Sequence, residues 1–165
     1  MDSDIKSQLI RLKELQNELK SQCEEDLSSE ATSDKARNLT QEVLVKARSI
    51  LDQTMYSFYK KKVLPNLSKN EADKARVYFP LVNKKEDLNS VLGRAMIRDL
   101  SKNYSKLYSF LESIQPYNHG FEWISDFVNY SNEKHVRLIP QTKTVYEKTV
   151  VSNGRGSVSW GAGGT

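Results

Sequence analysis

The chain has 165 residues, of which 38% are hydrophobic and 28% charged, and its net charge is +4. This length suits one domain with at most an appendage, and no apolar run approaches the roughly 18 residues of a transmembrane helix. With Cys23 as the single cysteine, a disulfide framework is excluded, and the acidic start of the chain is unlike a secretory signal. We therefore expect a cytoplasmic protein that does not enter the membrane.

The charge is unevenly distributed along the chain. Residues 1–34 carry nine acidic and four basic side chains, a net charge of −5, and the remaining residues carry 21 basic and 12 acidic side chains, a net charge of +9. Basic residues gather at Lys60, Lys61 and Lys62 and again at Lys84 and Lys85. Such clusters can attract phosphate backbones or acidic partners, although a plainly solvated surface is the simpler interpretation.

A first amphipathic helix is predicted over residues 3–25. Apolar side chains recur there at steps of three and four: Ile5, Leu9, Leu12, Leu15, Leu19 and Cys23. This spacing places one apolar face along the helix and puts Cys23 on that face, where we expect it to pack. The polar residues 28–33 end the helix and offer N-caps for the next one.

The strongest prediction is a second helix over residues 34–64. Apolar residues keep the helical spacing for these 31 residues until Pro65 ends the pattern. At about 1.5 Å per residue the helix would be roughly 46 Å long. A helix of this length needs long antiparallel neighbours, so the sequence predicts a helical bundle.

Residues 65–83 are predicted to connect the second helix to the next, with a helical turn near residues 71–76. Residues 77–81 are β-prone but contain Pro80, which favours an extended strap laid over the bundle. Asn83 and Glu86 have the spacing of a capping box, with Asn in the place of Ser or Thr.

The helical spacing resumes at Leu88 and continues to Ile114, and we expect a helix there with a kink or break near residues 101–103. Gln115, Pro116 and Tyr117 end it. A shorter closing helix follows, with Phe121, Ile124 and Val128 on one face and Pro140 at its far limit.

The composition changes after Pro140, which divides the chain into a helical bundle (1–140) and a β-prone, glycine-rich extension (141–165). Residues 142–151 favour a strand, residues 152–155 a tight turn, and five of the seven glycines lie in the last twelve residues. Because a lone hairpin is marginally stable, we expect the chain to stop within a β-rich appendage.

Familiar catalytic motifs are scarce. No glycine-rich loop follows a strand, and the two histidines, His119 and His135, lie in no metal-binding motif, so we expect neither a cofactor nor a metal. His135 lies eleven residues after Ile124, which directs it toward the bundle if the closing helix extends that far. It is then either a hydrogen-bonded core histidine or an acid–base group acting with Asn132.

Lys134 and Arg137 flank His135. Together with Lys60, Lys61 and Lys62 they are the candidate partners for RNA phosphates, with ordinary surface charge as the alternative.

The order of these features resembles a group of bacterial HEPN-like helical-bundle proteins. The resemblance spans residues 35–161 and rests on short motifs: Phe79-Pro80, Gln115-Pro116-Tyr117, Trp123, Asn132-Glu133-Lys134-His135 and Val158-Ser159-Trp160-Gly161. It implies a bundle that forms dimers, acts on or near RNA, and belongs to a toxin–antitoxin or phage-defence system.

HEPN ribonucleases carry an Arg-x(4–6)-His motif, and this chain departs from it. The positions that would supply the arginine for His135 are Val128, Asn129 and Tyr130, and those for His119 are Glu112, Ser113 and Ile114. Whether the chain is an enzyme therefore stays open.

We accordingly expect a mainly α protein, an up-and-down bundle of four or five helices that is HEPN-like, with a short C-terminal β extension. Its expected function is non-catalytic: self-association, as a homodimer, or binding of a protein partner. The alternative is a divergent HEPN-like ribonuclease acting on RNA. A third hypothesis is RNA binding without cleavage through the two lysine clusters.

Overall fold

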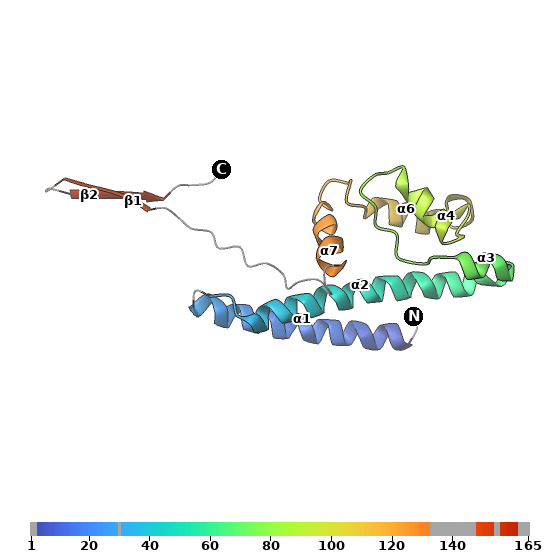
Figure 1. Cartoon of the computed structure of the whole chain (residues 1–165), viewed down its shortest axis with the longest axis horizontal. Coiled ribbons are helices and arrows are strands. Elements are labelled where there is room, and N and C mark those ends of the chain that lie inside the picture. Colours follow the sequence, from blue (N-terminus) through green and yellow to red (C-terminus); the bar gives the residue numbers. More distant parts are fainter. Residues whose placement is uncertain (1–2, 30, 133–147, 154–155, 162–165) are drawn as a thin grey trace.

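The computed structural model describes residues 3–29, 31–132, 148–153 and 156–161. This part of the chain is mainly α-helical, as predicted, but it contains seven α-helices rather than the expected four or five. Two long helices, α1 (Ser3–Ser29) and α2 (Asp34–Lys62), run antiparallel, and the shorter helices lie along the other side of α2 (Figure 1). Among the described helices, none is both long enough and apolar enough to cross a membrane.

Helix α1 packs on α2 through a seam that advances by three and four residues in turn. Its members are Ile5, Gln8, Leu12, Leu15, Leu19, Gln22 and Asp26, all buried or half-buried. The buried residues of α1 therefore repeat every 3.5 residues on average, and Gln22 is one of them. The prediction that Cys23 packs is therefore wrong, because this cysteine lies one position off the seam and is exposed.

The connection between α1 and α2 is held by Asp26. Its carboxylate accepts hydrogen bonds from the Ser33 backbone N–H (2.7 Å), the Ser33 hydroxyl (2.9 Å) and the Gln22 amide (2.9 Å). The bond from the Ser33 backbone, followed by that from Gln22, lowers the pKa of Asp26. Ser33 in turn caps α2 by accepting from the N–H of Ala36, which confirms the predicted polar cap.

Helix α2 ends at Lys62, and a short 3-10 turn (Leu64–Asn66) contains the predicted stop, Pro65. Helix α3 (Lys69–Lys74) follows, beginning with a capping box between Ser68 and Glu71. The predicted helical turn in this connection is confirmed, although it starts two residues earlier than expected.

The predicted strap is extended and lies along α2. The backbone N–H of Phe79 donates to Asp52 (2.8 Å), and its carbonyl accepts from Arg48 (3.3 Å). Buried Gln115 holds the far end of the strap, since it accepts from the N–H of Val82 (2.8 Å) and donates to the carbonyls of Pro80 (2.9 Å) and Leu111 (2.6 Å). The strap is thus fixed at two points.

The helix expected from Leu88 to Ile114 is broken at two places rather than one, into α4 (Asp87–Arg94), α5 (Leu100–Asn103) and α6 (Ser105–Ser113). Helix α4 ends in a Schellman arrangement: Met96 has φ 57°, its N–H bonds the Gly93 carbonyl, and the N–H of Ile97 bonds the Leu92 carbonyl. A second break, at Tyr104, lies next to the predicted kink or break.

The predicted capping box at Asn83 is also wrong. Helix α4 begins after Glu86, which makes no side-chain cap bond, and the Asn83 side chain instead accepts from the Ser125 hydroxyl (2.8 Å). Asn83 therefore ties the strap to α7 (Trp123–Asn132), the closing helix. Helix α7 buries Ile124, and its Tyr130 carbonyl accepts from Gln41 of α2 (3.2 Å).

The largest core cluster joins the C-terminal half of α2 to the strap and to α4–α6. Its buried members are Met55, Tyr59, Phe79, Val82, Leu88, Leu92, Ala95, Ile97, Leu100 and Leu111. Of the predicted β extension the structure describes two antiparallel strands, β1 (Lys148–Asn153) and β2 (Gly156–Gly161), paired from Asn153–Gly156 to Lys148–Gly161. The predicted boundary near residue 140 lies outside the described residues.

Candidate functional site

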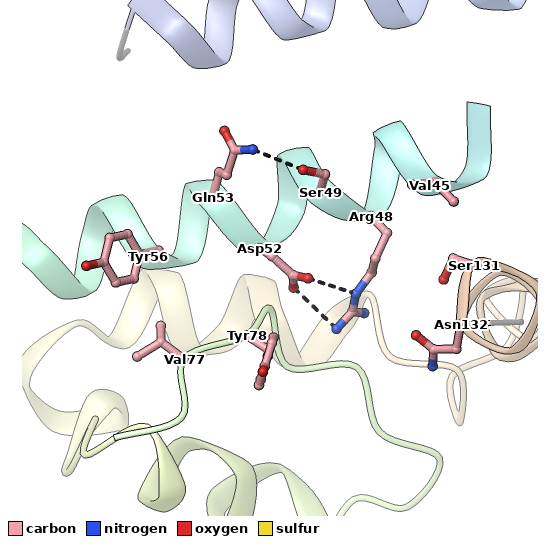
Figure 2. Close-up of a pocket in the computed structure, with 10 residues that line it drawn as sticks. All are labelled: Val45, Arg48, Ser49, Asp52, Gln53, Tyr56, Val77, Tyr78, Ser131 and Asn132. Carbon is pink, nitrogen blue, oxygen red and sulfur yellow. Dashed lines mark hydrogen bonds and ion pairs between the residues drawn. The ribbon is translucent and has the colours of Figure 1, made fainter. Parts of the chain in front are cut away.

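Helix α2 carries two hollows on nearly opposite faces. The first, which we call the polar cavity, has a volume of about 640 Å³. It lies between α2, the strap and the end of α7 (Figure 2). Its lining residues are Val45, Arg48, Ser49, Asp52, Gln53, Tyr56, Val77, Tyr78, Ser131 and Asn132.

Arg48 and Asp52 form the charged centre of the polar cavity. Arg48 Nε and Nη2 each lie 3.3 Å from a carboxylate oxygen of Asp52, one helical turn later. Their side chains are only 19% and 26% exposed. Because Nη2 also donates to Phe79 and Asp52 also accepts from Phe79, the strap holds the pair in place. Arg48 Nη1 is buried and has no hydrogen-bond partner among the described residues.

The rest of the polar cavity offers hydroxyls, an amide and apolar walls. Figure 2 shows Arg48 between Asp52, toward which its guanidinium is turned, and the end where Ser131 and Asn132 lie, with Tyr56 at the opposite end. Asn132 is exposed, whereas Ser131 is buried and donates to the Val128 carbonyl (3.0 Å). The Tyr56 and Tyr78 side chains are large and exposed. The cavity can therefore present hydrogen-bond donors at one end and aromatic surface along its length.

Of the residues predicted as catalytic, Asn132 is the last residue of α7 and lines the polar cavity. His135 lies outside the described residues, as do Lys134 and Arg137. The structure thus places Asn132 with Arg48, a residue that the sequence analysis did not single out. The signal was present in the sequence, since Arg48 and Asp52 form an i, i+4 pair of opposite charge on α2.

Lys60, Lys61 and Lys62 occupy the last turn of α2 and are exposed. In the described structure they line neither hollow of α2. Their position is favourable for α2 itself, because positive charge near the C-terminus of a helix interacts well with the helix dipole. Within the described ranges, no three His, Cys, Asp or Glu side chains are grouped so that they could hold a metal ion.

The second hollow, which we call the apolar groove, lies between α1, α2, the strap and α7 and has a volume of about 520 Å³. Its fifteen lining residues are Leu9, Leu12, Gln16, Val43, Leu44, Ala47, Ile50, Leu51, Phe79, Leu81, Ile114, Phe121, Trp123, Ile124 and Phe127. Gln16 is the single polar residue of this set. Trp123 remains 60% exposed and packs edge-on against Phe127 at a ring distance of 6.4 Å.

The two rims of the apolar groove carry opposite charge. On α1, Lys6 and Lys13 lie three residues before and four residues after Leu9, which places them beside the groove. On α7, Asp126 lies three residues after Trp123. All three charged side chains are exposed. The α1 rim is therefore basic, and the α7 rim is acidic.

No protein-family model, curated protein or solved structure matches this chain.

Proposed function

We propose that this chain is a non-catalytic helical module that associates with a second copy of itself through the apolar groove. The observation that carries the proposal is Trp123, 60% exposed at the edge of a groove in which fourteen of the fifteen lining residues are apolar. Exposed apolar patches of this kind mark interaction sites, and tryptophan is among the residues that contribute most to binding.

A second copy suits the groove because the same face holds both a protruding side chain and a hollow. In a two-fold dimer each surface patch meets itself, so Trp123 of each copy can enter the groove of the other. A two-fold axis along α2 would also bring the basic α1 rim, with Lys13, opposite the acidic α7 rim, with Asp126. Charge complementarity of this kind favours one orientation over others.

The HEPN-like, up-and-down character of the bundle and its place in a toxin–antitoxin or phage-defence system belong to the same proposal. The HEPN-like character is supported by the coupling of two motifs that carry the resemblance. Pro80 of the Phe79-Pro80 strap and Gln115 of the Gln115-Pro116-Tyr117 stop are both buried and joined by a hydrogen bond of 2.9 Å. The ribonuclease alternative depends on His135, outside the described residues, and stays a prediction.

The test is the mass of the purified protein in solution, measured by light scattering over a range of concentrations. The wild type is expected as a dimer, and Trp123→Ser is expected to weaken the dimer by roughly 1,000-fold, because truncation of an aromatic anchor costs about 2 kcal/mol or more and each dimer loses two such anchors. Phe110→Ser is the matched control, since Phe110 is 54% exposed on α6 and does not line the groove in the described structure.

A wild-type protein that stays monomeric at every concentration contradicts the proposal. So does a Trp123→Ser variant that dimerises as tightly as Phe110→Ser.

A further inference from the structure

We propose that the polar cavity binds a small-molecule monocarboxylate with an aromatic or aliphatic body, and that Arg48 Nη1 is the principal donor to the carboxylate. This site lies on the face of α2 opposite the apolar groove, and no residue lines both. The inference therefore does not depend on self-association.

The first reason is the unused donor on Arg48. Two of the three guanidinium nitrogens are engaged by Asp52 and Phe79, whereas Nη1 is buried without a partner among the described residues. A buried donor without an acceptor is unfavourable, and a charged acceptor forms the strongest hydrogen bond with such a donor. A carboxylate oxygen of a ligand would accept a hydrogen bond from Nη1 and supply the missing partner.

The second reason concerns the charge of the ligand. Arg48 is the one cation among the ten described lining residues, and the carboxylate of Asp52 lies beside it. The carboxylate of Asp52 already balances Arg48, so a bound monocarboxylate adds one uncompensated negative charge, whereas the dianion of a phosphate monoester adds two and is repelled more strongly by Asp52. A neutral amide offers Nη1 only an uncharged carbonyl oxygen, which accepts a weaker hydrogen bond than a carboxylate does. The cavity therefore favours a carboxylate over both.

The third reason is the shape and surface of the cavity. About 640 Å³ is within the range of small-molecule sites. Val45 and Val77 supply apolar wall, and Tyr56 and Tyr78 supply aromatic faces against which a ring can stack. At the other end, the amide of Asn132 can donate a second hydrogen bond to a carboxylate held by Arg48.

Sodium benzoate is the probe, with benzamide as its neutral counterpart and phenyl phosphate as its dianionic one. Binding is followed on the full chain by NMR titration of backbone amides. Benzoate is expected to bind saturably and to shift Tyr78 and Asn132, with both counterparts at least tenfold weaker. Arg48→Lys, which keeps a positive charge near Asp52 but lacks Nη1, is expected to weaken benzoate at least tenfold.

Asn132→Asp keeps the proposal testable if Arg48→Lys fails to fold. Both Asn132 and Asn89 of α4 are exposed, so neither change to Asp disturbs a packed core. A negative charge at Asn132 is expected to weaken benzoate roughly tenfold, whereas Asn89→Asp should change affinity less than twofold.

Three results would overturn the inference: no saturable benzoate binding, benzamide or phenyl phosphate binding as tightly as benzoate, or equal effects of the two Asn→Asp changes. Each of them leaves the dimerisation test of Trp123→Ser unaffected.

Discussion

Gln115 is the residue on which the strap depends. It is 0% exposed, and its amide bridges strap residues Pro80 and Val82 to Leu111 of α6. Glutamine is a residue type expected at the surface, so its identity alone does not predict a buried bridge. The sequence indicated Gln115 only as part of a helix stop. Its three hydrogen-bond partners are backbone groups that the fold brings together, so no sequence pattern near Gln115 indicates them.

Replacing Gln115 by Leu is expected to lower the free energy of unfolding by roughly 2–4 kcal/mol, because the Val82 N–H and the Pro80 carbonyl would stay buried without partners. Urea denaturation monitored by circular dichroism measures this change. Ser109→Ala, at an exposed position of α6, the helix that precedes Gln115, should change stability by less than about 0.5 kcal/mol. A Gln115→Leu protein as stable as the Ser109→Ala protein would show that the bridge contributes little.

At the scale of elements, long periodic helices were predictable and their breaks were not. The spacing of apolar residues through Leu92, Ala95 and Leu100 continues across the end of α4, so the pattern reads as one helix. The end itself has Met96 in the left-handed conformation, where glycine is the usual residue. Without glycine at that position, the sequence contains no local signal for the Schellman arrangement.

Apolar spacing also did not predict which residue of α1, Gln22 or Cys23, is buried against α2. Both Gln22 and Cys23 lie within reach of the predicted face, and cysteine is the more apolar residue. A straight helix of period 3.6 and a supercoiled seam of period 3.5 differ by about one residue over several turns. Packing on α2 selects the shorter period, which buries Gln22 and exposes Cys23.

The connection of α1 to α2 gives a pH prediction. Hydrogen bonds from Ser33 and Gln22 stabilise the charged form of Asp26, so its pKa in the folded state is below its unfolded value of about 3.9. The contribution is therefore present above about pH 4 and is lost as pH falls through the lowered folded pKa. Thermal melts between pH 7 and pH 2.5 should show a smaller loss in Asp26→Asn than in the wild type, because Glu71, whose pKa is lowered by hydrogen bonds from Ser68, loses its own contribution in both proteins.

Asp73→Asn on α3 is the control for Asp26→Asn. The Asp73 side chain is exposed and makes no hydrogen bond in the described part of the chain, so this variant should lose stability with falling pH in parallel with the wild type. If Asp26→Asn also follows the wild type throughout, the carboxylate of Asp26 does not hold the connection.

For the whole molecule, the sequence predicted the helical class and the packing of long helices, but not the two hollows. The polar cavity forms where Ser131 and Asn132, at the end of α7, approach α2 and the strap. Ser131 lies 75 residues after Tyr56 of α2 and 53 residues after Tyr78 of the strap in the chain. Hydrophobic periodicity shows which face of each helix is buried, but it does not show which segments meet there.

The charged rims of the apolar groove permit a test of how two copies are oriented. Lys13→Glu and Asp126→Lys are each expected to weaken the dimer by roughly threefold to tenfold, because each places like charges on facing rims. The double variant restores opposite charge in both places and is expected to dimerise within about twofold of the wild type. Sedimentation velocity at low salt measures all four proteins.

Recovery in the double variant requires that Lys13 of one copy faces Asp126 of the other. Single losses that merely add in the double variant would indicate a different two-fold axis, in which equivalent rims face each other.

Phe79 connects the two hollows, although it is not among the lining residues of the polar cavity. Its side chain lines the apolar groove, while its backbone N–H and carbonyl are bonded to Asp52 and Arg48 on the wall of the polar cavity. Any ligand that draws Arg48 away from the Phe79 carbonyl would therefore alter the surface on which two copies meet. Thermodynamic reciprocity then requires that dimerisation change the ligand affinity by the same factor by which the ligand changes dimerisation. Phe79 would in this way couple ligand binding to dimerisation.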